Sequence, residues 1–479
     1  MPAGPSDITA VSAPGKVLLA GGYLVLDRAY TGLVFGLSAR INVVAQAIKT
    51  SPGVQLTEIV VESPQFLEAQ WAYGYHLTDA DGGILVTQLR IGSTIRANLF
   101  VETTLSYALT YVSRLAHLNP SHSITPLRLT ILADNDYYSQ PSLHTSTSSS
   151  GSSSSATVTP EANTGAGRFA RFFTPLSSAH KTGLGSSAAL VTALTAAVLS
   201  HYLPASLFDL ATEAGKLTLH NLAQAAHCAA QGKVGSGFDV AAAVYGSCMY
   251  RRFSPSVLAG LPEPGAPGFG AALEKVVADG STVEGDGDGD GDGSRQWDTE
   301  IAKGSVALPA GVAVRMCDVD CGSQTVGMVK KVLAWRSSQP DASKALWDAL
   351  QRQNDALAAA LRTGQTEELP AILRSVRELV RQMGTKSGVP IEPDSQTELL
   401  DALSALDGVY GGVVPGAGGY DAVALLVKDD EATAARLEAF LKKWSQDKSE
   451  RVRLLAVKGE MEGVRREDKA VYEEWLSSA

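Results

Sequence analysis

The stretch that decides the fold is "HKTGLGSSAALVTALTAAVL", residues 180–199. In it a polar turn with two glycines, Gly183 and Gly185, leads directly into an apolar helix that begins with paired serines. The N-terminus of a helix leaves backbone amides unpaired and carries a partial positive charge, so it attracts anions. Glycines let such a backbone approach a phosphate without a side chain in the way. We therefore expect this stretch to bind phosphate groups.

Other residues of the stretch have separate expected roles. Ser186 and Ser187 are expected to cap the helix or to offer hydroxyl groups to phosphate or metal, and Lys181 supplies a charge at the entrance. Ala188 and Ala189 allow the first helical turn to pack tightly. Taken alone, the stretch also fits an ordinary serine-capped core helix. A Walker loop is disfavoured because no Gly-Lys-Ser/Thr is present, and a Rossmann site because a polar segment precedes the glycines.

Length and composition indicate a globular protein with more than one lobe. The chain has 479 residues, and its longest apolar run, residues 188–199, is too short to span a membrane. A net charge of -10 disfavours indiscriminate binding to nucleic acid or to acidic membranes. Neither end of the chain resembles a signal peptide or a retention or peroxisomal signal, so we expect a cytoplasmic protein.

The four cysteines are too few for a disulfide framework in a chain of this length. Cys317 and Cys321 in "CDVDC" would lie on one face of a strand, but no second pair of Cys or His residues is near them. Metal binding is therefore disfavoured. We expect all four cysteines, Cys228, Cys248, Cys317 and Cys321, to be buried thiols.

Two segments have the composition of insertions. Residues 142–167 are nearly all small and polar, and residues 285–293 alternate glycine with aspartate. Neither segment can bury enough apolar surface to offset the entropy lost on ordering, so both are predicted to be disordered loops, near 140–167 and 280–296. The acidic repeat lacks the far glutamate of a calcium-binding loop, which disfavours calcium.

The hydrophobic pattern predicts a strand-rich first part and a helix-rich second part. The predicted strands are residues 40–47, 54–61, 127–134, 311–322, 421–427 and 451–457. The predicted helices are residues 105–116, 344–362 and 368–384, the last ending at Gly384, with a further helix between the final two strands. This order indicates a two-lobed α+β chain, with lobes at residues 1–320 and 321–479 and a junction rich in proline and glycine from about Pro255 onward.

Three further stretches change the interpretation of the phosphate-binding turn. Lys16 enters an apolar strand in "SAPGKVLLAGGYLVL", residues 12–26, and Asp239 follows a flexible turn in "GKVGSGFDVAAAVYG", residues 232–246. A third glycine turn, "VPGAGGYDAVALLV", precedes a strand at residues 414–427. Singly, these stretches fit a surface lysine, a helix cap and a plain hairpin. Together they are poorly explained by such independent structural roles.

In this order and spacing, the chain resembles the GHMP kinases, a family of small-molecule kinases that includes galactokinase, homoserine kinase and mevalonate kinase. The three family motifs match residues 13–23, 182–190 and 416–426. Many members have an acidic residue after the glycine of the first motif, whereas this chain has Gly21, Gly22 and Tyr23. Together with residues 232–247 and 321–332, that departure resembles the fungal branch whose members phosphorylate 5-phosphomevalonate.

The resemblance implies a fold and a set of site residues. The N-terminal lobe would resemble domain 2 of ribosomal protein S5, and the C-terminal lobe would be ferredoxin-like. Lys16 and Asp239 match the catalytic lysine and aspartate of the family. The residues expected to bind ATP are Lys181, Thr182, Gly183, Leu184, Gly185, Ser186, Ser187, Ala188 and Ala189. Those expected to bind the acceptor are Tyr23, Lys233, Ser236, Ser323, Gln324 and Gly418.

The resemblance also implies a magnesium ion. Mevalonate kinases place a magnesium-binding glutamate on the helix before the catalytic aspartate, but the corresponding residues 223–233 contain no acid. We therefore expect Mg²⁺ to be held chiefly by Ser187, by water and by the ATP phosphates, which suits an ion that keeps several waters.

The implied reaction transfers the γ-phosphate of ATP to 5-phosphomevalonate, giving 5-diphosphomevalonate and ADP in isoprenoid and sterol synthesis. Because a phosphate monoester has its second pKa near roughly 6, the acceptor is already mostly dianionic at neutral pH. We therefore expect Asp239 mainly to orient Lys16 and the acceptor, and Lys16, Lys181, Lys233 and the helix terminus at Ser186 to offset the anionic charge. Alternatives are mevalonate kinase or another kinase of the family, a diphosphomevalonate decarboxylase, and a catalytically silent sensor. The oligomeric state stays open.

Overall fold

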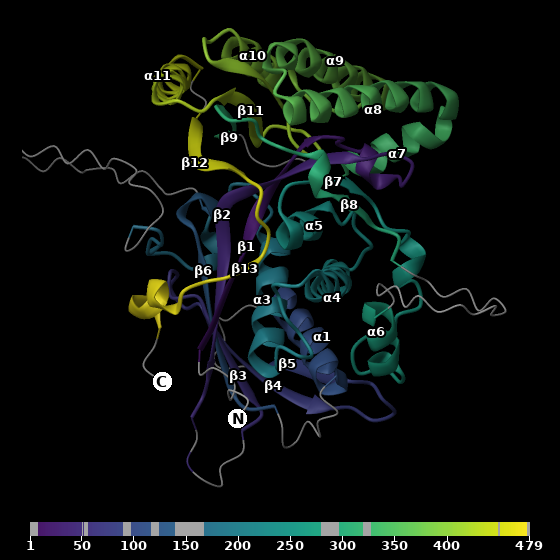
Figure 1. Ribbon diagram of the computed structural model, residues 1–479, viewed down its shortest axis with the longest axis vertical. Coiled ribbons are helices and arrows are strands. Elements are labelled where there is room, and N and C mark those ends of the chain that lie inside the picture. Colours follow the sequence, from purple (N-terminus) through teal and green to yellow (C-terminus); the bar gives the residue numbers. More distant parts are fainter. Residues whose placement is uncertain are drawn as a thin grey trace, which may run out of the picture.

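The computed structural model describes residues 8–49, 51, 56–89, 97–115, 124–138, 167–278, 297–319, 327–448 and 451–476. Figure 1 shows two lobes stacked along the longest axis, with the N-terminal strands and helices below and a group of later helices above. The predicted insertions near 140–167 and 280–296 lie outside the described residues, apart from Gly167. Among the described residues, no helix is both long enough and apolar enough to cross a membrane.

The described residues form strands and helices, with successive strands, β1 to β5, early in the chain and successive α-helices, α7 to α10, later. The strands are β1 (Ile8–Ala20), β2 (Gly32–Ala47), β3 (Glu58–Glu62), β4 (Gln70–Leu77), β5 (Ile84–Leu89), β6 (Leu127–Ala133), β7 (Cys248–Arg251), β8 (Glu300–Ala302), β9 (Val312–Val319), β10 (Val409–Val413), β11 (Ala422–Lys428), β12 (Val452–Glu460) and β13 (Arg465–Arg466). The helices are α1 (Leu99–Leu115), α3 (Ser186–Tyr202), α4 (Glu213–Gln231), α5 (Phe238–Tyr245), α6 (Phe269–Ala278), α7 (Met328–Ser338), α8 (Pro340–Thr363), α9 (Leu369–Ser387), α10 (Asp394–Ser404) and α11 (Glu431–Lys448).

One strand, β12, connects the sheets of the two lobes. The strand order is β10-β11-β9-β12-β2-β6-β3-β4-β5, and β1, β7 and β13 pair beside this path. Near its start β12 pairs with β9, where Val452 faces Val319. At its end it pairs with β2, where Gly459 faces Leu37. The chain therefore returns from the second lobe to the first, and the predicted boundary between residues 320 and 321 stays a prediction.

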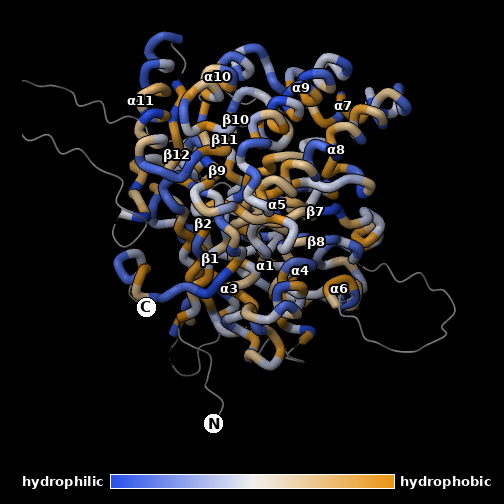
Figure 2. The backbone as a smooth tube through the Cα atoms, turned by 45° about the horizontal axis from the view of Figure 1, so that its top comes forward, coloured by the Kyte–Doolittle hydropathy of each residue, from blue (hydrophilic) through white to orange (hydrophobic). Residues whose placement is uncertain are grey.

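Helix α3, which follows the predicted phosphate-binding turn, is the central helix of the first lobe. It packs against β1 and β2 on one side and against α1, α4 and α5 on others. Figure 2 shows it as largely apolar and surrounded by other elements. A helix that is apolar around its whole circumference is stable in water only when it is buried on all sides. The almost uncharged sequence of this helix is thus explained by its position.

Most of the predicted elements are present, but the end predicted for one helix is wrong. Helix α9 continues past Gly384 to Ser387 and ends at Gly388, which adopts a left-handed conformation with φ +64°. Gly384 lies inside the helix. Glycine is required at this position because a Cβ atom there would lie 2.7 Å from the carbonyl oxygen of Val389. Its glycine therefore reflects a close approach of the following chain and not a helix stop.

The cysteines of the described chain are buried thiols, as predicted. Cys228, Cys248 and Cys317 are free and buried, whereas Cys321 lies outside the described residues. Burial raises the pKa of Cys248 and of Cys317 to about 12, so both thiols are protonated at neutral pH.

Candidate active site

Lys16 extends from β1 directly after an irregularity in that strand. The register between β1 and β2 shifts between Pro14 and Gly15, and such bulges re-aim the neighbouring side chains. A Cβ atom on Gly15 would lie 2.9 Å from the carbonyl oxygen of Leu184. The backbone N–H of Lys16 donates a 2.9 Å hydrogen bond to that same oxygen. Glycine at position 15 therefore lets residues 181–187, called the phosphate loop below, lie against Lys16.

Two buried residues anchor the phosphate loop. Thr182 donates its backbone N–H to the carbonyl of Tyr137 at 3.1 Å, and its hydroxyl to the carbonyl of Asp136 at 2.5 Å. The side chain of Leu184 belongs to the hydrophobic core. Both side chains thus fix the loop and are not available to a ligand.

Gly185 begins helix α3 in a left-handed conformation, with φ +81°. Within the described residues no side chain caps this terminus, so its first amide groups are left for an anion. A Cβ atom on Gly185 would lie 2.7 Å from Cε of Lys16. The lysine side chain therefore crosses in front of the helix terminus, and glycine is needed to leave it room.

The residues that follow Gly185 divide into two pairs. Ser186 and Ser187 are partly exposed at the first turn of α3, where their hydroxyl groups are accessible to a ligand. Ala188 and Ala189 are fully buried. The small side chains of Ala188 and Ala189 thus let the first turn of α3 pack tightly, as the sequence predicts, and only their backbone is available to a ligand.

The turn before Asp239 is held by Tyr250 of β7 and by Arg252, which directly follows that strand. A Cβ atom on Gly237, which has φ +84°, would lie 2.6 Å from the hydroxyl oxygen of Tyr250. That hydroxyl donates a 2.7 Å hydrogen bond to the carbonyl of Ser236. The Arg252 guanidinium donates to the carbonyl of Gly235 at 2.8 Å. This turn is therefore rigidly placed, and Ser236 with it.

Lys16 and Asp239 interact electrostatically across the site. Burial lowers the pKa of Lys16, and the negative charge of Asp239 acts in the opposite direction. The Lys16 Nζ lies 5.3 Å from the centre of the Phe238 ring, a distance at which the ring face attracts a cation. Asp239 lies in the first turn of α5, where its Oδ1 accepts a 3.0 Å hydrogen bond from the N–H of Val240.

His227 of α4 lies between the phosphate loop and Asp239. Its Nε2 is 3.2 Å from Oγ of Ser187 and 4.0 Å from Oδ2 of Asp239. Only 2% of the histidine is exposed. Two oxygens predicted to serve the reaction thus face one nitrogen that the sequence analysis did not single out.

The third glycine motif closes the other side of the site. Gly416 donates its N–H to the carbonyl of Leu18 in β1 at 3.2 Å. A Cβ atom on Gly22 would lie 2.3 Å from the carbonyl oxygen of Gly416. This contact gives a physical reason for the unusual Gly21–Gly22 pair: a glutamate at position 22 would displace the third motif.

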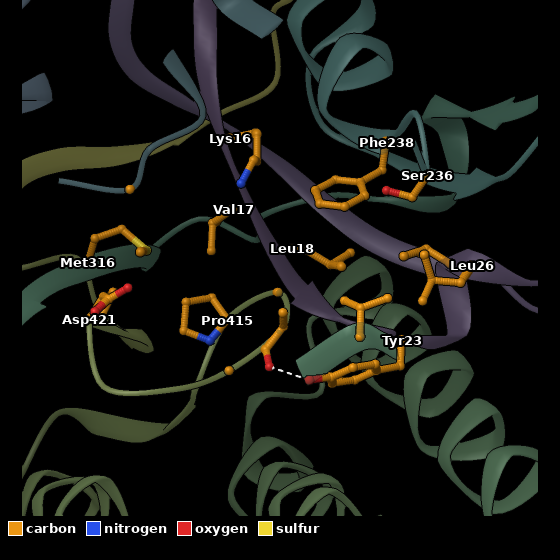
Figure 3. A pocket seen from close by; sticks show the side chains of 17 residues that line it. Lys16, Val17, Leu18, Tyr23, Leu26, Ser236, Phe238, Met316, Pro415 and Asp421 are labelled. Carbon is orange, nitrogen blue, oxygen red and sulfur yellow. Dashed lines mark hydrogen bonds between the residues drawn. The ribbon is translucent and has the colours of Figure 1, made fainter. Parts of the chain in front are cut away.

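These segments surround a cavity of about 340 Å³, lined by five of the predicted site residues: Lys16, Tyr23, Gly183, Ser236 and Gly418. Figure 3 shows Lys16 and Tyr23 at opposite ends of the group, with the Nζ atom of Lys16 directed inward. Phe238, Met316 and Asp421 also line the cavity. Its wall is largely apolar, with polar groups at a few positions, which is the usual make-up of a small-molecule site.

The other predicted site residues of the described chain are not among those that line the cavity; these include Asp239 and most of the phosphate loop. Lys181 is exposed at the start of the phosphate loop, where its backbone forms an isolated antiparallel β-bridge with Tyr138. Lys233 is exposed after α4 and is not among the residues that line the cavity. Ser323 and Gln324 lie outside the described residues. The acceptor-binding roles of Lys233, Ser323 and Gln324 stay predictions.

Sequence reasoning missed His227, Arg252, Phe238 and Asp421. For Phe238 and Asp421 a signal was present, because each lies inside a motif that was already identified. Arg252 and His227 gave no local signal, because Arg252 lies just after strand β7, outside the motif, and His227 lies in a helix without motif residues. Only the packing of the elements shows what these two side chains contact.

The arrangement suits a reaction between anions. The start of helix α3 has no side-chain cap, and Lys16 lies directly beside it; helix termini and lysines are groups that bind and neutralise phosphate. Among the described residues, no three His, Cys, Asp or Glu side chains form a group able to hold a metal by themselves. The hard oxygens of Ser187 and Asp239 near one nitrogen nevertheless fit a magnesium ion that takes its other ligands from water and phosphate.

Comparisons with known proteins agree with this geometry. The profile of the GHMP kinases N terminal domain matches residues 175–247, and that of the GHMP kinases C terminal region matches residues 357–446. Phosphomevalonate kinase of Gibberella zeae is 62% identical over 467 residues, which cover 98% of each chain. Phosphomevalonate kinase of Aspergillus fumigatus is 45% identical over 514 residues, covering 98% of this chain and 99% of that protein.

The fold is shared with a solved structure as well. The structure of Streptococcus pneumoniae phosphomevalonate kinase in complex with phosphomevalonate and AMPPNP matches with a TM-score of 0.56 and 16% identity, over 96% of this chain and 100% of that chain. The predicted two-lobed α+β architecture is confirmed. The chain belongs to the GHMP kinases, within the group formed by the fungal phosphomevalonate kinases.

Proposed function

We propose that this protein transfers the γ-phosphate of ATP to the phosphate group of 5-phosphomevalonate, producing 5-diphosphomevalonate and ADP. The observation that carries the proposal is the 62% identity, over 98% of both chains, with a phosphomevalonate kinase. The resulting product would serve isoprenoid and sterol synthesis. A cytoplasmic location stays a prediction.

The nucleotide binds at the phosphate loop. Its phosphates lie against the open amides at the start of α3, where Gly183 and Gly185 leave the backbone accessible. Lys16, which crosses in front of this terminus, places its charge between the nucleotide and the cavity. Phosphoryl transfer depends mostly on positioning and charge neutralisation, so these two features supply most of what the reaction needs.

The acceptor occupies the cavity of about 340 Å³ between the motifs. The carboxylate of Asp421 on one wall repels an anionic group, whereas Lys16 attracts one. The acceptor phosphate therefore turns toward Lys16 and the phosphate loop. The apolar side chains between these two charges, Val17 and Leu18 among them, contact the carbon skeleton of the acceptor.

Ser187 and Asp239 are the residues that would hold magnesium together with water and the ATP phosphates. When bound, the ion neutralises part of the phosphate charge. Ser187 would supply its hydroxyl oxygen, and Asp239 would bind directly or through a water. Asp239 also keeps Lys16 charged, because its negative charge raises the pKa of that lysine against the effect of burial. No general base is required for an acceptor that is already ionised.

The test is coupled ADP release with magnesium, ATP and a panel of acceptors. Turnover on 5-phosphomevalonate alone, with a diphosphate product, is the expected result. Turnover on mevalonate, homoserine or galactose in its place would contradict the proposed acceptor and leave the kinase assignment intact. Binding of ATP without turnover on any acceptor would contradict the kinase assignment.

A further inference from the structure

His227 lies in the candidate active site, and neither the sequence analysis nor the proposed function gives it a role. It lies near the end of α4, the helix that precedes Asp239, and its side chain is almost completely buried. Its Nε2 is 3.2 Å from the hydroxyl oxygen of Ser187. The same nitrogen is 4.0 Å from a carboxylate oxygen of Asp239. A buried imidazole that faces the hydroxyl oxygen of Ser187 and a carboxylate oxygen of Asp239 differs from a histidine that only fills the hydrophobic core.

The ring is held in place by its other neighbours. The side-chain amide nitrogen of Gln231, one turn further along α4, lies 3.0 Å from Nε2 and 3.4 Å from Nδ1, so it faces the same nitrogen as the Ser187 hydroxyl. Phe100 of α1 packs against the ring with the two centres 5.8 Å apart. A ring restrained in this way offers its nitrogen in one direction, as a group that orients another side chain must.

The hydroxyl of Ser187 needs such a partner. A serine that gives an oxygen lone pair to a cation must direct its proton elsewhere, and an imidazole nitrogen that carries no proton accepts it. An unpartnered hydroxyl on the first turn of a helix would instead turn back to the carbonyl groups of its own chain. The contact with His227 therefore selects the orientation of Ser187 in which the oxygen faces the phosphate loop.

We propose that His227 is a positioning residue that fixes the Ser187 hydroxyl toward the magnesium and phosphates of bound ATP. This inference rests on the proposed function. An imidazole also suits the site better than a carboxylate would, because the protein has a net charge of -10 and has to bring two anionic substrates together. The ring orients the hydroxyl and adds no further negative charge.

The experiment compares His227→Leu, which removes the nitrogen, with His227→Gln, which places a polar atom near the position of Nε2. The affinity for ADP is measured by titration calorimetry on the full chain, with magnesium and again with EDTA. Because outer-shell partners of metal ligands typically contribute about 10-fold or more to affinity, His227→Leu is expected to weaken magnesium–ADP binding by about 10-fold. With EDTA its affinity should equal that of the natural protein, and His227→Gln should restore most of the loss.

His220 provides the matched control. It lies two turns earlier on the same helix, is 1% exposed, and contacts Asn221 and the Trp297 ring away from the cavity. His220→Leu should leave both affinities unchanged. A loss in His227→Leu that is equal with and without magnesium, or that His220→Leu shares, would overturn the proposal by showing a purely structural role.

A second measurement keeps the proposal testable if His227→Leu folds poorly. His227→Asn, whose shorter side chain does not reach the Ser187 hydroxyl, and Ser187→Ala are made singly and together. If His227 acts through Ser187, its substitution should add almost nothing to the loss caused by Ser187→Ala, whereas additive losses would contradict the coupling. Failure of the natural protein to bind magnesium–ADP would overturn the proposed function itself, and is thereby distinguished from failure of this inference.

Discussion

The hydroxyl group of Tyr23 donates a 2.7 Å hydrogen bond to the carbonyl of Ala417, 394 positions away in the chain. The bond joins the first glycine motif to the third, and Figure 3 shows it at the lower edge of the cavity. Tyr23 makes it from a left-handed backbone conformation, with φ +65°, which a bulky residue adopts only when its surroundings enforce it. Tyr23 therefore shapes the acceptor cavity by holding the loop at Ala417.

We predict that Tyr23→Phe weakens use of the acceptor and spares use of ATP. Because a net hydrogen bond contributes about 1 kcal/mol, the KM for 5-phosphomevalonate should rise about 5-fold, with the KM for ATP unchanged. Steady-state kinetics with each substrate varied in turn measures both values. Tyr73→Phe is the matched control, because Tyr73 is fully buried and its hydroxyl has no hydrogen-bond partner among the described residues. Equal effects of the two substitutions would contradict the role of Tyr23.

Gly22→Ala tests the contact between the same two motifs from the backbone side. The added Cβ would lie 2.3 Å from the carbonyl oxygen of Gly416, so the loop of the third motif has to move. We expect kcat/KM for the acceptor to fall by about 100-fold, as a displacement of about 1 Å in a positioned group commonly causes. Gly304→Ala, where no atom lies within 4 Å of the new Cβ, should have normal kinetics. A fully active Gly22→Ala enzyme would show that the loop adapts.

The sequence predicted the site wherever the chemistry lies within one motif. Lys16, Gly183, Ser236 and Gly418 were recognised in separate stretches, and the structure brings all four to one cavity. The glycine turn and the apolar helix after it were likewise predicted from residue types, whereas phosphate binding at this turn stays a prediction.

The remaining features depend on contacts between distant segments. His227 has no sequence signal because its function arises from the packing of α4 against the start of α3. The end of α9 was mispredicted because Gly384 looks like a helix stop, whereas its glycine is required by the carbonyl of Val389. In both cases a tertiary contact, which no local pattern contains, decides the structure.

Stability toward acid provides a prediction that is independent of the reaction. Burial lowers the pKa of His220 from 6.5 to about 4, although the hydrogen bond with Asn221 opposes this shift. Between these two values the unfolded chain binds a proton that the folded protein does not. The stability that depends on neutral His220 is therefore fully present above pH 6.5 and is lost as the pH falls toward 4.

His220→Leu should remove that contribution to the pH dependence. Between pH 7 and pH 5 the free energy of unfolding of the natural protein should fall by about 2 kcal/mol more than that of the variant. Urea unfolding at the two pH values measures this difference. His76→Gln, a change at an exposed histidine, should behave like the natural protein. Parallel pH dependence of His220→Leu and the natural protein would contradict the prediction.

The relation between Lys16 and Asp239 predicts how catalysis depends on pH. Burial lowers the pKa of Lys16 below its ordinary value of 10.5, and the charge of Asp239 raises it in part. Since the reaction needs the charged lysine, kcat/KM should decrease at alkaline pH with an apparent pKa below 10.5. Lys16→Arg should shift this decrease to higher pH, because a guanidinium keeps its proton, and Lys16→Met should lose about 100-fold or more in kcat.

Asp239→Asn then distinguishes two of the roles proposed for the aspartate, raising the pKa of Lys16 and acting as a general base. Removing its charge removes the interaction that raises the pKa of Lys16, so the alkaline decrease in kcat/KM should move to lower pH while measurable turnover remains near pH 7. An essential general base would give a different result, with turnover almost abolished at neutral pH and rising steeply as the pH increases. Asp447→Asn, at an exposed aspartate of α11, controls for the loss of one negative charge and should follow the natural profile. The pH profiles of the three enzymes, measured with 5-phosphomevalonate, therefore decide whether Asp239 acts on Lys16 or on the proton of the acceptor.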